Sequence, residues 1–401
     1  MGLLRTLAIA ILTISFITFV AFFGQLPALR KTPVGWLQRA LCVQLPNGLR
    51  RVDNVLSGGK VAQRCTHLGQ YLFYERNPVV LFIFLFLLTG SATIFLYSTI
   101  ARLPWRLVLP LFVLLPAPYI FTFWCASHTA HYITPANHAL RMNDYPYDHI
   151  LFRPSTTCPT CHIRKPPRSK HCSFCGYCVA KCDHHCPWVN NCLGRGNYRW
   201  FLALLLSMTA LQVYGAYLSW WILRPNFHFN PQNSFLSPAF RQEVGDNFVI
   251  AIKIGGISVA GVGLLAAATA SLPFGLFAYH CYLIWAGMTT NESQKWTEWK
   301  DDVADGFVFK GNRKELQDHH RARRTDGSRA TVNPALAALL EEDEVHVPWP
   351  ISNDEVLVRT RDGNAPRGQE ALWKPVRSLD DIVNVYDLGT LNNLKEEIHG
   401  R

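Results

Sequence analysis

The sequence predicts an all-α, multi-pass membrane protein with about five transmembrane helices and a cysteine-rich domain on the cytosolic side. Three observations predict this fold class. Hydrophobic residues make up 49% of the 401 residues, and they are gathered into long runs. The 17% of residues that are charged lie almost wholly between those runs. Eight of the twelve cysteines fall between Cys158 and Cys192. This clustering argues against the roughly two or three soluble domains that such a length would usually suggest.

Five apolar segments are long enough to cross a bilayer. A hydrocarbon core of about 30 Å needs roughly 20 apolar residues in a helix. The last segment lies in an apolar stretch of about forty residues, which is too long for one straight span. We expect the first part of that stretch to approach the span in the lumen or at the interface. The predicted spans are residues 1–29 (apolar from Leu7), Val79–Tyr97, about Leu107–Cys125, Trp200–Leu223 and roughly Ile257–Tyr282.

The distribution of charge gives the expected direction of the spans. The loop 30–77 holds eight basic residues against two acidic ones, and segment 126–199 is also strongly basic. Because cytosolic loops carry an excess of Lys and Arg, both segments are expected in the cytosol. The N-terminus would then be lumenal. Helices two and three would lie within 78–125, helices four and five within 200–287, and the tail 288–401 in the cytosol.

The first apolar run has a competing interpretation, because a short basic start at Arg5 before an apolar stretch also resembles a signal peptide. Its cleavage would place the cysteine-rich segment in the lumen. That location does not fit the metal-binding role that the cysteine spacing, described next, predicts for this segment. The net charge of +11 could suggest a nucleic-acid partner. Basic loops beside a membrane would give the same net positive charge. We therefore expect the chain to interact with the lipid bilayer and not with nucleic acid.

The cysteines and histidines of segment 158–192 have the spacing of metal ligands. Cys-x2-Cys at 158–161 is followed by His-Cys-x2-Cys-x2-Cys at 171–178, Cys182, Asp-His-His-Cys at 183–186 and Cys192. Two cysteines separated by two residues let one tight turn direct both sulfurs at a tetrahedral zinc ion. A disulfide framework would need an oxidising compartment. The spacing therefore predicts a domain that zinc stabilises.

Segment 158–192 contains more cysteines and histidines than two zinc sites need. His162 lies in the gap between the first two motifs, which leaves eight cysteines and three well-placed histidines. Two sites of three cysteines and one histidine would use six of these cysteines and two of these histidines, and two cysteines and one histidine would remain. Asp183 and His184 beside Cys186 fit an orienting carboxylate, a base and a thiol nucleophile. The alternative is a hydrogen-bonded Asp–His pair that only supports a neighbouring zinc site.

The segment from Cys158 to Phe201 closely resembles the Asp-His-His-Cys (DHHC) family of protein S-acyltransferases, or palmitoyltransferases. It reads CPTCHIRKPPRSKHCSFCGYCVAKCDHHCPWVNNCLGRGNYRWF, with the metal spacing intact. Two further motifs are similar: Thr-Thr-Asn-Glu at 289–292, and an aromatic and asparagine motif at 384–393, which implies that the tail returns to the membrane domain. Among subgroups, the chain most resembles the fungal branch involved in spore-wall formation, which works at the endoplasmic reticulum membrane.

The resemblance implies a role for each motif residue. Cys186 would be the nucleophile, His184 its base and Asp183 the group that orients the imidazole. Trp188 would lie near the mouth of a cavity for the acyl chain, and Thr290 would contact the Asp183 region. Two structural zinc ions would be bound, one by Cys158, Cys161, His171 and Cys178, and the other by Cys172, Cys175, His185 and Cys192.

The implied activity is protein S-palmitoylation. Cys186 would take the acyl group of palmitoyl-CoA and pass it to cytosolic cysteines beside the transmembrane segments of other proteins. Nearby basic residues are expected to contact phosphates of CoA and of the cytosolic leaflet: Arg164, Lys165, Arg168, Lys170, Lys181, Arg195 and Arg199. The alternative is a non-catalytic, zinc-stabilised membrane scaffold, which would not need Asp183, His184 and Cys186 together.

Overall fold

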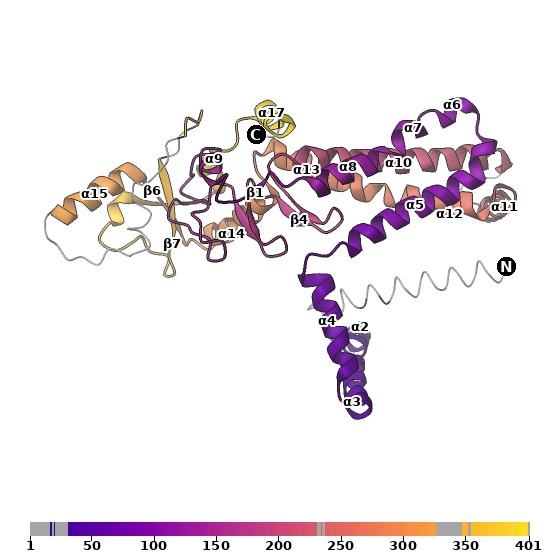
Figure 1. The fold of residues 1–401 in the computed structure, drawn as a ribbon, viewed down its shortest axis with the longest axis horizontal. Helices are drawn as coiled ribbons and strands as arrows, with labels where there is room; N and C mark the ends of the chain where they lie inside the picture. The colour runs from indigo at the N-terminus through magenta and orange to yellow at the C-terminus, as the bar shows by residue number, and fades with distance from the viewer. Residues whose placement is uncertain are drawn as a thin grey trace. The chain divides into compact units, whose positions relative to one another are not determined.

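The computed structural model (Figure 1) describes Ile17, Val20, residues 31–230, 234, 237–325, 347–351 and 354–399. The chain forms two compact units, residues 1–77 and residues 78–401. Apart from Ile17 and Val20, the first predicted transmembrane segment, 1–29, lies outside the described residues.

A helical hairpin makes up the described part of the first unit. Helix α2 (Pro33–Arg39), the π-helical turn η1 (Ala40–Gln44) and α3 (Leu45–Ser57) follow one another with helical backbone at each junction. Gly58 and Gly59 take left-handed conformations, with φ of 67° and 83°, and end the first arm. The Asp53 carboxylate accepts a hydrogen bond of 2.7 Å from the Ala62 amide at the start of α4 (Lys60–Tyr74). The glycine pair and this bond therefore fix the turn.

Among the described residues, four helical segments are long and apolar enough to cross a membrane. They correspond to the second to fifth predicted spans, so an integral membrane protein is confirmed, whereas the predicted number of five is not. The segments are Val79–Arg102 (α5, Val79–Thr99, and turn η2, Ile100–Arg102), Trp105–Ser127, Tyr198–Asn226 (α10, Tyr198–Leu223, and turn η3, Arg224–Asn226) and Ile257–Trp285.

Two of these segments consist of more than one helix. The second consists of α6 (Trp105–Val108), α7 (Leu111–Leu114) and α8 (Ala117–Ser127), with Pro110 and Pro116 at the junctions. The last consists of α12 (Ile257–Thr269) and α13 (Ser271–Trp285). Helix α11 (Pro238–Gly255) precedes it and is separated from it by Gly256, with φ of 102°. The long apolar stretch thus contains one span and the end of a separate helix.

Helix α10 is the centre of the membrane-spanning part. It contacts α8, α12 and α13, and α5 contacts α12 (Figure 1). Leu218 and Val259 are fully buried between these helices. Large apolar side chains on the outer faces, such as Phe86 and Tyr97, are exposed. Such faces are expected of helices that cross a bilayer, because apolar side chains are compatible with the hydrocarbon core.

Short β-strands build the cysteine-rich domain, so the prediction of an all-α protein is wrong here. Strands β1 (Tyr132–Ile133) and β2 (Lys170–Cys172) pair antiparallel with β3 (Tyr177–Val179), and β4 (His184–Cys186) pairs with β5 (Asn191–Leu193). The short helix α9 (His138–Met142) lies between β1 and β2 in the chain. Strands of two or three residues leave almost no alternating pattern in a sequence, and closely spaced ligands favour tight turns.

The tail also contains strands, in a third small sheet ordered β7–β6–β8. Helix α14 (Thr290–Ala304) precedes it, and Trp299 and Val303 of this helix pack with Val308 and Leu357 of the sheet. The remaining elements are β6 (Val308–Asn312), α15 (Arg313–Thr325), β7 (Glu355–Arg359), 3-10 turns η4 (Glu370–Leu372) and η5 (Leu379–Asp381), β8 (Trp373–Pro375) and α17 (Thr390–His399).

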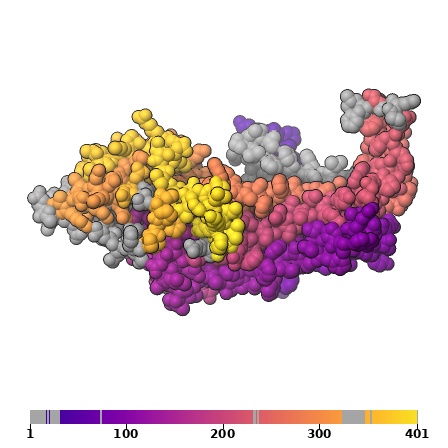
Figure 2. Space-filling model, turned by 90° about the horizontal axis from the view of Figure 1, so that it is seen from above, coloured from indigo at the N-terminus to yellow at the C-terminus, as the bar shows by residue number. Residues whose placement is uncertain are grey.

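The C-terminal helix α17 returns to the membrane-spanning part, as the 384–393 motif implies. It contacts α13 and α10, and Figure 2 shows these last residues, in yellow, against the spans. Asn393 donates to the Trp285 carbonyl at 3.5 Å and to the Asp387 carboxylate at 2.8 Å. Gly287 has φ of 63°, and a Cβ there would come within 2.5 Å of the Asp387 Cα atom. The close approach therefore requires glycine at the end of the last span.

Candidate active site

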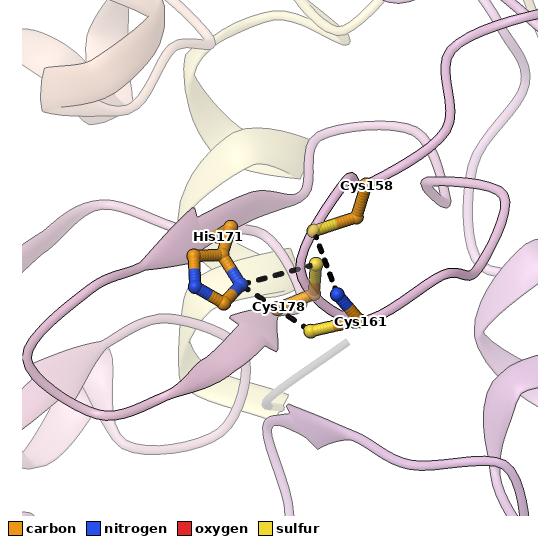
Figure 3. A group of neighbouring side chains, drawn as sticks. All are labelled: Cys158, Cys161, His171 and Cys178. Atoms are coloured by element: carbon orange, nitrogen blue, oxygen red, sulfur yellow. Dashed lines mark hydrogen bonds between the residues drawn. The ribbon is translucent and has the colours of Figure 1, made fainter.

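The first predicted ligand set comes together beside strands β2 and β3 (Figure 3). The ligand atoms of Cys158, Cys161, His171 and Cys178 all lie within 4.8 Å of one another. The His171 Nδ1 atom is 3.3 Å from the Cys161 sulfur and 3.9 Å from the Cys178 sulfur. His171 on β2 lies opposite Cys178 on β3 in the antiparallel pair. A tight turn places the Cys158 and Cys161 side chains next to them. This donor set fits a bound metal ion.

The second predicted set forms a separate cluster. The His185 Nδ1 atom lies 3.4 Å from the Cys175 sulfur and 3.7 Å from the sulfurs of Cys172 and Cys192. Phe174 stacks on the His185 ring with a centroid distance of 4.8 Å. The sulfurs of Cys175 and Cys192 are 3.6 Å apart, far beyond the roughly 2.05 Å of a disulfide. The two clusters therefore fit metal binding and not a disulfide framework.

Strand geometry explains why neighbours in the motif have different surroundings. Successive side chains of a strand point to opposite faces. In β4, His185 points into the second metal cluster, whereas His184 and Cys186 share the other face. Pairing of Cys186 with Asn191 and of His185 with Cys192 holds this register. A one-residue slip would exchange the two histidines, so the cluster that holds His185 also fixes where His184 points.

Asp183 is buried, and both of its carboxylate oxygens form hydrogen bonds. Its Oδ2 atom is 2.5 Å from His184 Nδ1 and accepts the Thr290 hydroxyl at 2.9 Å. Its Oδ1 atom accepts the Thr290 amide at 2.7 Å. Burial raises the pKa of Asp183, but the hydrogen bond and charge of His184 outweigh it and hold the pKa below its usual value. Burial lowers the pKa of His184, yet Asp183 and Cys186 together raise it to about 9. The contact between Thr290 and Asp183 implied by the resemblance is present.

Sequence reasoning missed His280 and Phe201, which lie beside the His184 ring, and Tyr198, which contacts His280. The rings of His280 and Phe201 lie 5.8 Å and 5.7 Å from the His184 ring. The Tyr198 hydroxyl is hydrogen-bonded to His280 Nδ1 at 2.8 Å. His280 Nε2 is buried, and one ring nitrogen of His280 lies within 4.8 Å of ligand atoms of Asp183 and His184. A histidine in the apolar run of the last span was the available signal, because polar residues inside spans usually serve a function.

A mostly apolar cavity of about 360 Å³ lies among the spans. Trp188, two residues after Cys186, lines it and meets Phe84 edge to face at 6.2 Å. Gln212 and Thr269 are hydrogen-bonded at 3.0 Å in its wall. The other lining residues, which the sequence alone did not identify, are Leu87, Leu88, Ser91, Ala92, Phe95, Leu96, Leu111, Leu115, Met208, Leu211, Gly215, Val262, Leu265 and Ala266.

Two of the basic residues expected at the phosphates are instead buried in ion pairs. Arg168 donates two hydrogen bonds of 2.7 Å to Glu292. Lys181 lies 2.8 Å from Glu396 and 2.6 Å from Glu397. These pairs join the cysteine-rich domain to α14 and α17. The expectation of phosphate contacts was therefore wrong for Arg168 and Lys181, because folding places acidic groups from the distant tail against them.

Comparison with known proteins identifies the family. The model of the DHHC palmitoyltransferase family matches residues 152–297. The chain is 38% identical to palmitoyltransferase SWF1 of Neurospora crassa over 98% of this chain and 92% of that protein. It is also 38% identical to palmitoyltransferase swf1 of Emericella nidulans, over 98% of this chain and 96% of that protein. Identity to palmitoyltransferase swf1 of Schizosaccharomyces pombe is 35%, over 74% and 81% of the two chains.

The two matches over 98% of the chain cover the metal clusters, the Asp183–His184–Cys186 segment and the spans together. They confirm the resemblance drawn from the motifs and favour the enzyme over the non-catalytic scaffold, which they do not support. The chain therefore belongs to the DHHC palmitoyltransferase family, within its SWF1 branch, and is a protein S-acyltransferase.

Proposed function

We propose that Cys186 carries the acyl group, with His184 as its base and Asp183 as the group that orients His184. The observation that supports this assignment is that His184 and Cys186 lie on the same face of strand β4. The Asp183 carboxylate is hydrogen-bonded to Nδ1 of the His184 imidazole. The bond to Asp183 occupies His184 Nδ1, which leaves Nε2 for the thiol. An unperturbed thiol has a pKa of about 8.5, so a nearby base increases its reactive thiolate fraction.

The reaction proceeds in two balanced halves. His184 takes the proton of the Cys186 thiol, and the thiolate attacks the carbonyl carbon of palmitoyl-CoA. The carbon–sulfur bond to CoA breaks, the CoA thiolate takes the proton from His184, and a palmitoyl thioester remains on Cys186. His184 then deprotonates a substrate cysteine, whose thiolate attacks that thioester, and Cys186 leaves and is reprotonated. One thioester forms for each one broken, so the enzyme supplies position and proton transfer rather than driving force.

The cavity that Trp188 lines is the proposed site of the acyl chain. Burying a methylene contributes roughly 0.8 kcal/mol, so a chain of about sixteen carbons gains more from an apolar cavity than from any other contact here. Its wall is formed mainly by Leu, Phe and Ala side chains of α5, α10 and α12. The pair of Gln212 and Thr269 is a polar point in that wall. We expect palmitoyl-CoA as the donor on this basis.

A second cavity, of about 330 Å³, supports a place for the CoA phosphates. Lys165, Lys170 and Lys295 line it together with Arg153, and Asn291 at its edge follows Thr290 directly. Burial lowers the pKa of Lys295. A bound phosphate would oppose that effect, because an opposite charge nearby favours the protonated amine. The cytosolic leaflet offers the same phosphate chemistry, and we propose that these residues serve both.

Zinc is the proposed metal of both clusters. Two sulfurs that each lie about 2.3 Å from a tetrahedral zinc ion are about 3.8 Å apart, and the sulfurs of Cys175 and Cys192 are 3.6 Å apart. With three cysteines and one histidine each, both sets leave no position for water or substrate. Bound zinc contributes folding energy, about 10–16 kcal/mol in small zinc modules. The clusters would thus hold strand β4 and the nucleophile in place.

The proposed substrates are membrane proteins with cysteines beside the cytosolic end of a transmembrane segment. The charge of loops 30–77 and 126–199 supports a cytosolic active site. A thioester on Cys186 at the end of the spans would reach only thiols held near the membrane surface. The branch resemblance supports the endoplasmic reticulum membrane as location, with a lumenal N-terminus.

Incubation of the purified chain with labelled palmitoyl-CoA tests the assignment. We expect a label that hydroxylamine removes, and that is absent from Cys186→Ser. The matched control is Cys182→Ser, because Cys182 is also buried in the motif but belongs to neither metal cluster. Equal labelling of Cys186→Ser and wild type would show that another residue is the nucleophile. A wild type with both zinc ions and no label would instead favour the scaffold.

A further inference from the structure

One face of helix α3 is apolar, and no described residue of its own unit, 1–77, covers it. Leu45, Leu49, Val52, Val55 and Leu56 follow the helical repeat and lie within roughly 120° of its circumference. Exposure reaches 85% at Val55 and 80% at Leu56, and no residue of α3 is buried. We call these five residues the apolar stripe.

The partner helix α4 does not cover the apolar stripe. Its own apolar residues Val61, Leu68 and Leu72 lie on one face, and Val61 and Leu68 are exposed. No described side chain of α4 is buried either. A helix in water gains most of its stability by packing its apolar face, and a large exposed apolar patch marks an interaction surface. The hairpin is therefore incomplete without a partner.

The charge of the hairpin favours an anionic lipid surface as that partner. Residues 31–77 hold seven basic residues against two acidic ones. Arg50 and Arg51 lie on α3 off the apolar stripe, and Lys60 and Arg64 lie on α4. Interfacial helices have this combination of an apolar face and a basic polar face, and anionic headgroups attract each nearby Lys or Arg.

The connection to the next span keeps the hairpin at the membrane. Helix α4 ends at Tyr74 and the membrane-spanning helix α5 begins at Val79. Five residues of extended chain reach at most about 18 Å, so the end of α4 cannot leave the vicinity of the headgroups. On the first arm, Trp36 is 61% exposed, and tryptophan is the residue enriched at membrane interfaces.

We propose that the hairpin Pro33–Tyr74 lies in the headgroup layer of an anionic leaflet. The apolar stripe enters the boundary of the acyl chains, and Arg50 and Arg51 face the lipid phosphates. This surface is separate from the catalytic assignment, since all metal clusters and the Asp183–His184–Cys186 segment belong to residues 78–401.

The test places an environment-sensitive fluorescent amino acid in the full chain at Val55, or at Asn54 as the matched control on the polar face. The protein is reconstituted in vesicles of phosphatidylcholine and phosphatidylserine. At position 55 we expect blue-shifted emission, quenching by lipids with a nitroxide near the top of the acyl chain, and protection from aqueous iodide. At position 54 we expect iodide quenching. Equal iodide quenching at both positions would overturn the proposal.

Protection from iodide at position 55 without quenching by nitroxide lipid would also overturn it, because the stripe would then be covered by protein, either a second copy or another part of this chain. The charge contribution is tested with Arg50→Glu/Arg51→Glu. The loss of two cations alone should reduce the ratio of membrane-bound to free hairpin by about thirtyfold, and repulsion of the two new carboxylates should reduce it further. The measured sign is that iodide quenching returns at position 55. Unchanged protection in this variant, with zinc content equal to wild type, would refute the role of the anionic surface.

Discussion

Replacing Glu292 with glutamine should loosen the cysteine-rich domain from helix α14 without touching a metal ligand. Arg168 Nε and Nη2 donate to the two Glu292 carboxylate oxygens at 2.7 Å each, and their side chains are only 2% and 1% exposed. Glu292 also accepts the Thr289 amide at 2.9 Å in a capping box of α14. Glutamine keeps the shape and can keep that capping bond. It leaves the guanidinium buried without its main counter-charge.

The size of the effect follows from what remains around Arg168. Removing one partner of a buried ion pair costs about 3–5 kcal/mol. A second carboxylate, Glu396, lies 3.8 Å from Arg168 Nη1, and the Tyr386 ring lies 4.5 Å from its guanidinium carbon. Because these groups still stabilise the guanidinium, we expect the loss of stabilising free energy near the lower end of that range, about 3 kcal/mol. This loss corresponds to about a hundredfold change in the equilibrium for opening of the contact between the cysteine-rich domain and α14. Replacing both partners with methionine removes the unpaired charge, so the double variant should lose less than the two single losses combined.

Native-state hydrogen exchange of α14, followed by mass spectrometry in detergent, measures this opening. Amides of Thr290–Ala304 should exchange about a hundredfold faster in Glu292→Gln. The matched control is Glu298→Gln, an exposed glutamate of the same helix, which should change exchange by less than about threefold. Equal exchange in the two variants would refute the reasoning. The reasoning would also be refuted if the double variant Arg168→Met/Glu292→Met lost as much stabilising free energy as the two single variants combined.

Four further outcomes are expected. Cys161→Ala should lower bound zinc and the yield of folded protein, so two zinc ions per chain in that variant would contradict the ligand assignment. Thr290→Val removes the hydroxyl bond to Asp183 and should slow autoacylation about tenfold or more, whereas Thr290→Ser should retain it. His280→Phe fills the space but loses the tyrosine hydroxyl partner, so labelling should slow about two- to tenfold with normal zinc, and His280→Gln should recover part of the rate. Gly215→Phe should shift donor preference toward shorter acyl-CoA in competition assays, since Gly215 lines the cavity and a Cβ there would meet only Ala266, at 4.0 Å. Unchanged chain preference would remove the cavity as the acyl site.

Much of the candidate site could be predicted because its residues are close in sequence. Spacing and family resemblance together named the eight metal-binding candidates, and the structure brings them together in two sets of four. The assignment of His185 to a metal cluster and of His184 to the neighbouring face came only from the resemblance. The structure supplies its physical reason, which is the alternation of side chains along β4.

Predictions failed where partners came from distant parts of the chain. Arg168 and Lys181 looked like surface cations, yet glutamates more than a hundred residues away bury them in ion pairs. His280 was missed from the sequence, because only helix packing places it beside His184. The all-α prediction failed because strands of two to five residues leave too short a pattern to recognise.

Composition and spacing within short segments were enough to predict the four spans found among the described residues, the family, and the ligand and nucleophile candidates. Only the tertiary structure decided which charges are buried, which helices line the cavity and which side chains surround the Asp183–His184 pair. Those features depend on contacts between segments far apart in the chain, and a single sequence carries no record of which distant residues meet. The amphipathic pattern of the hairpin 33–74 is local in the sequence, whereas only the folded structure shows that no described residue of its own unit covers the apolar stripe.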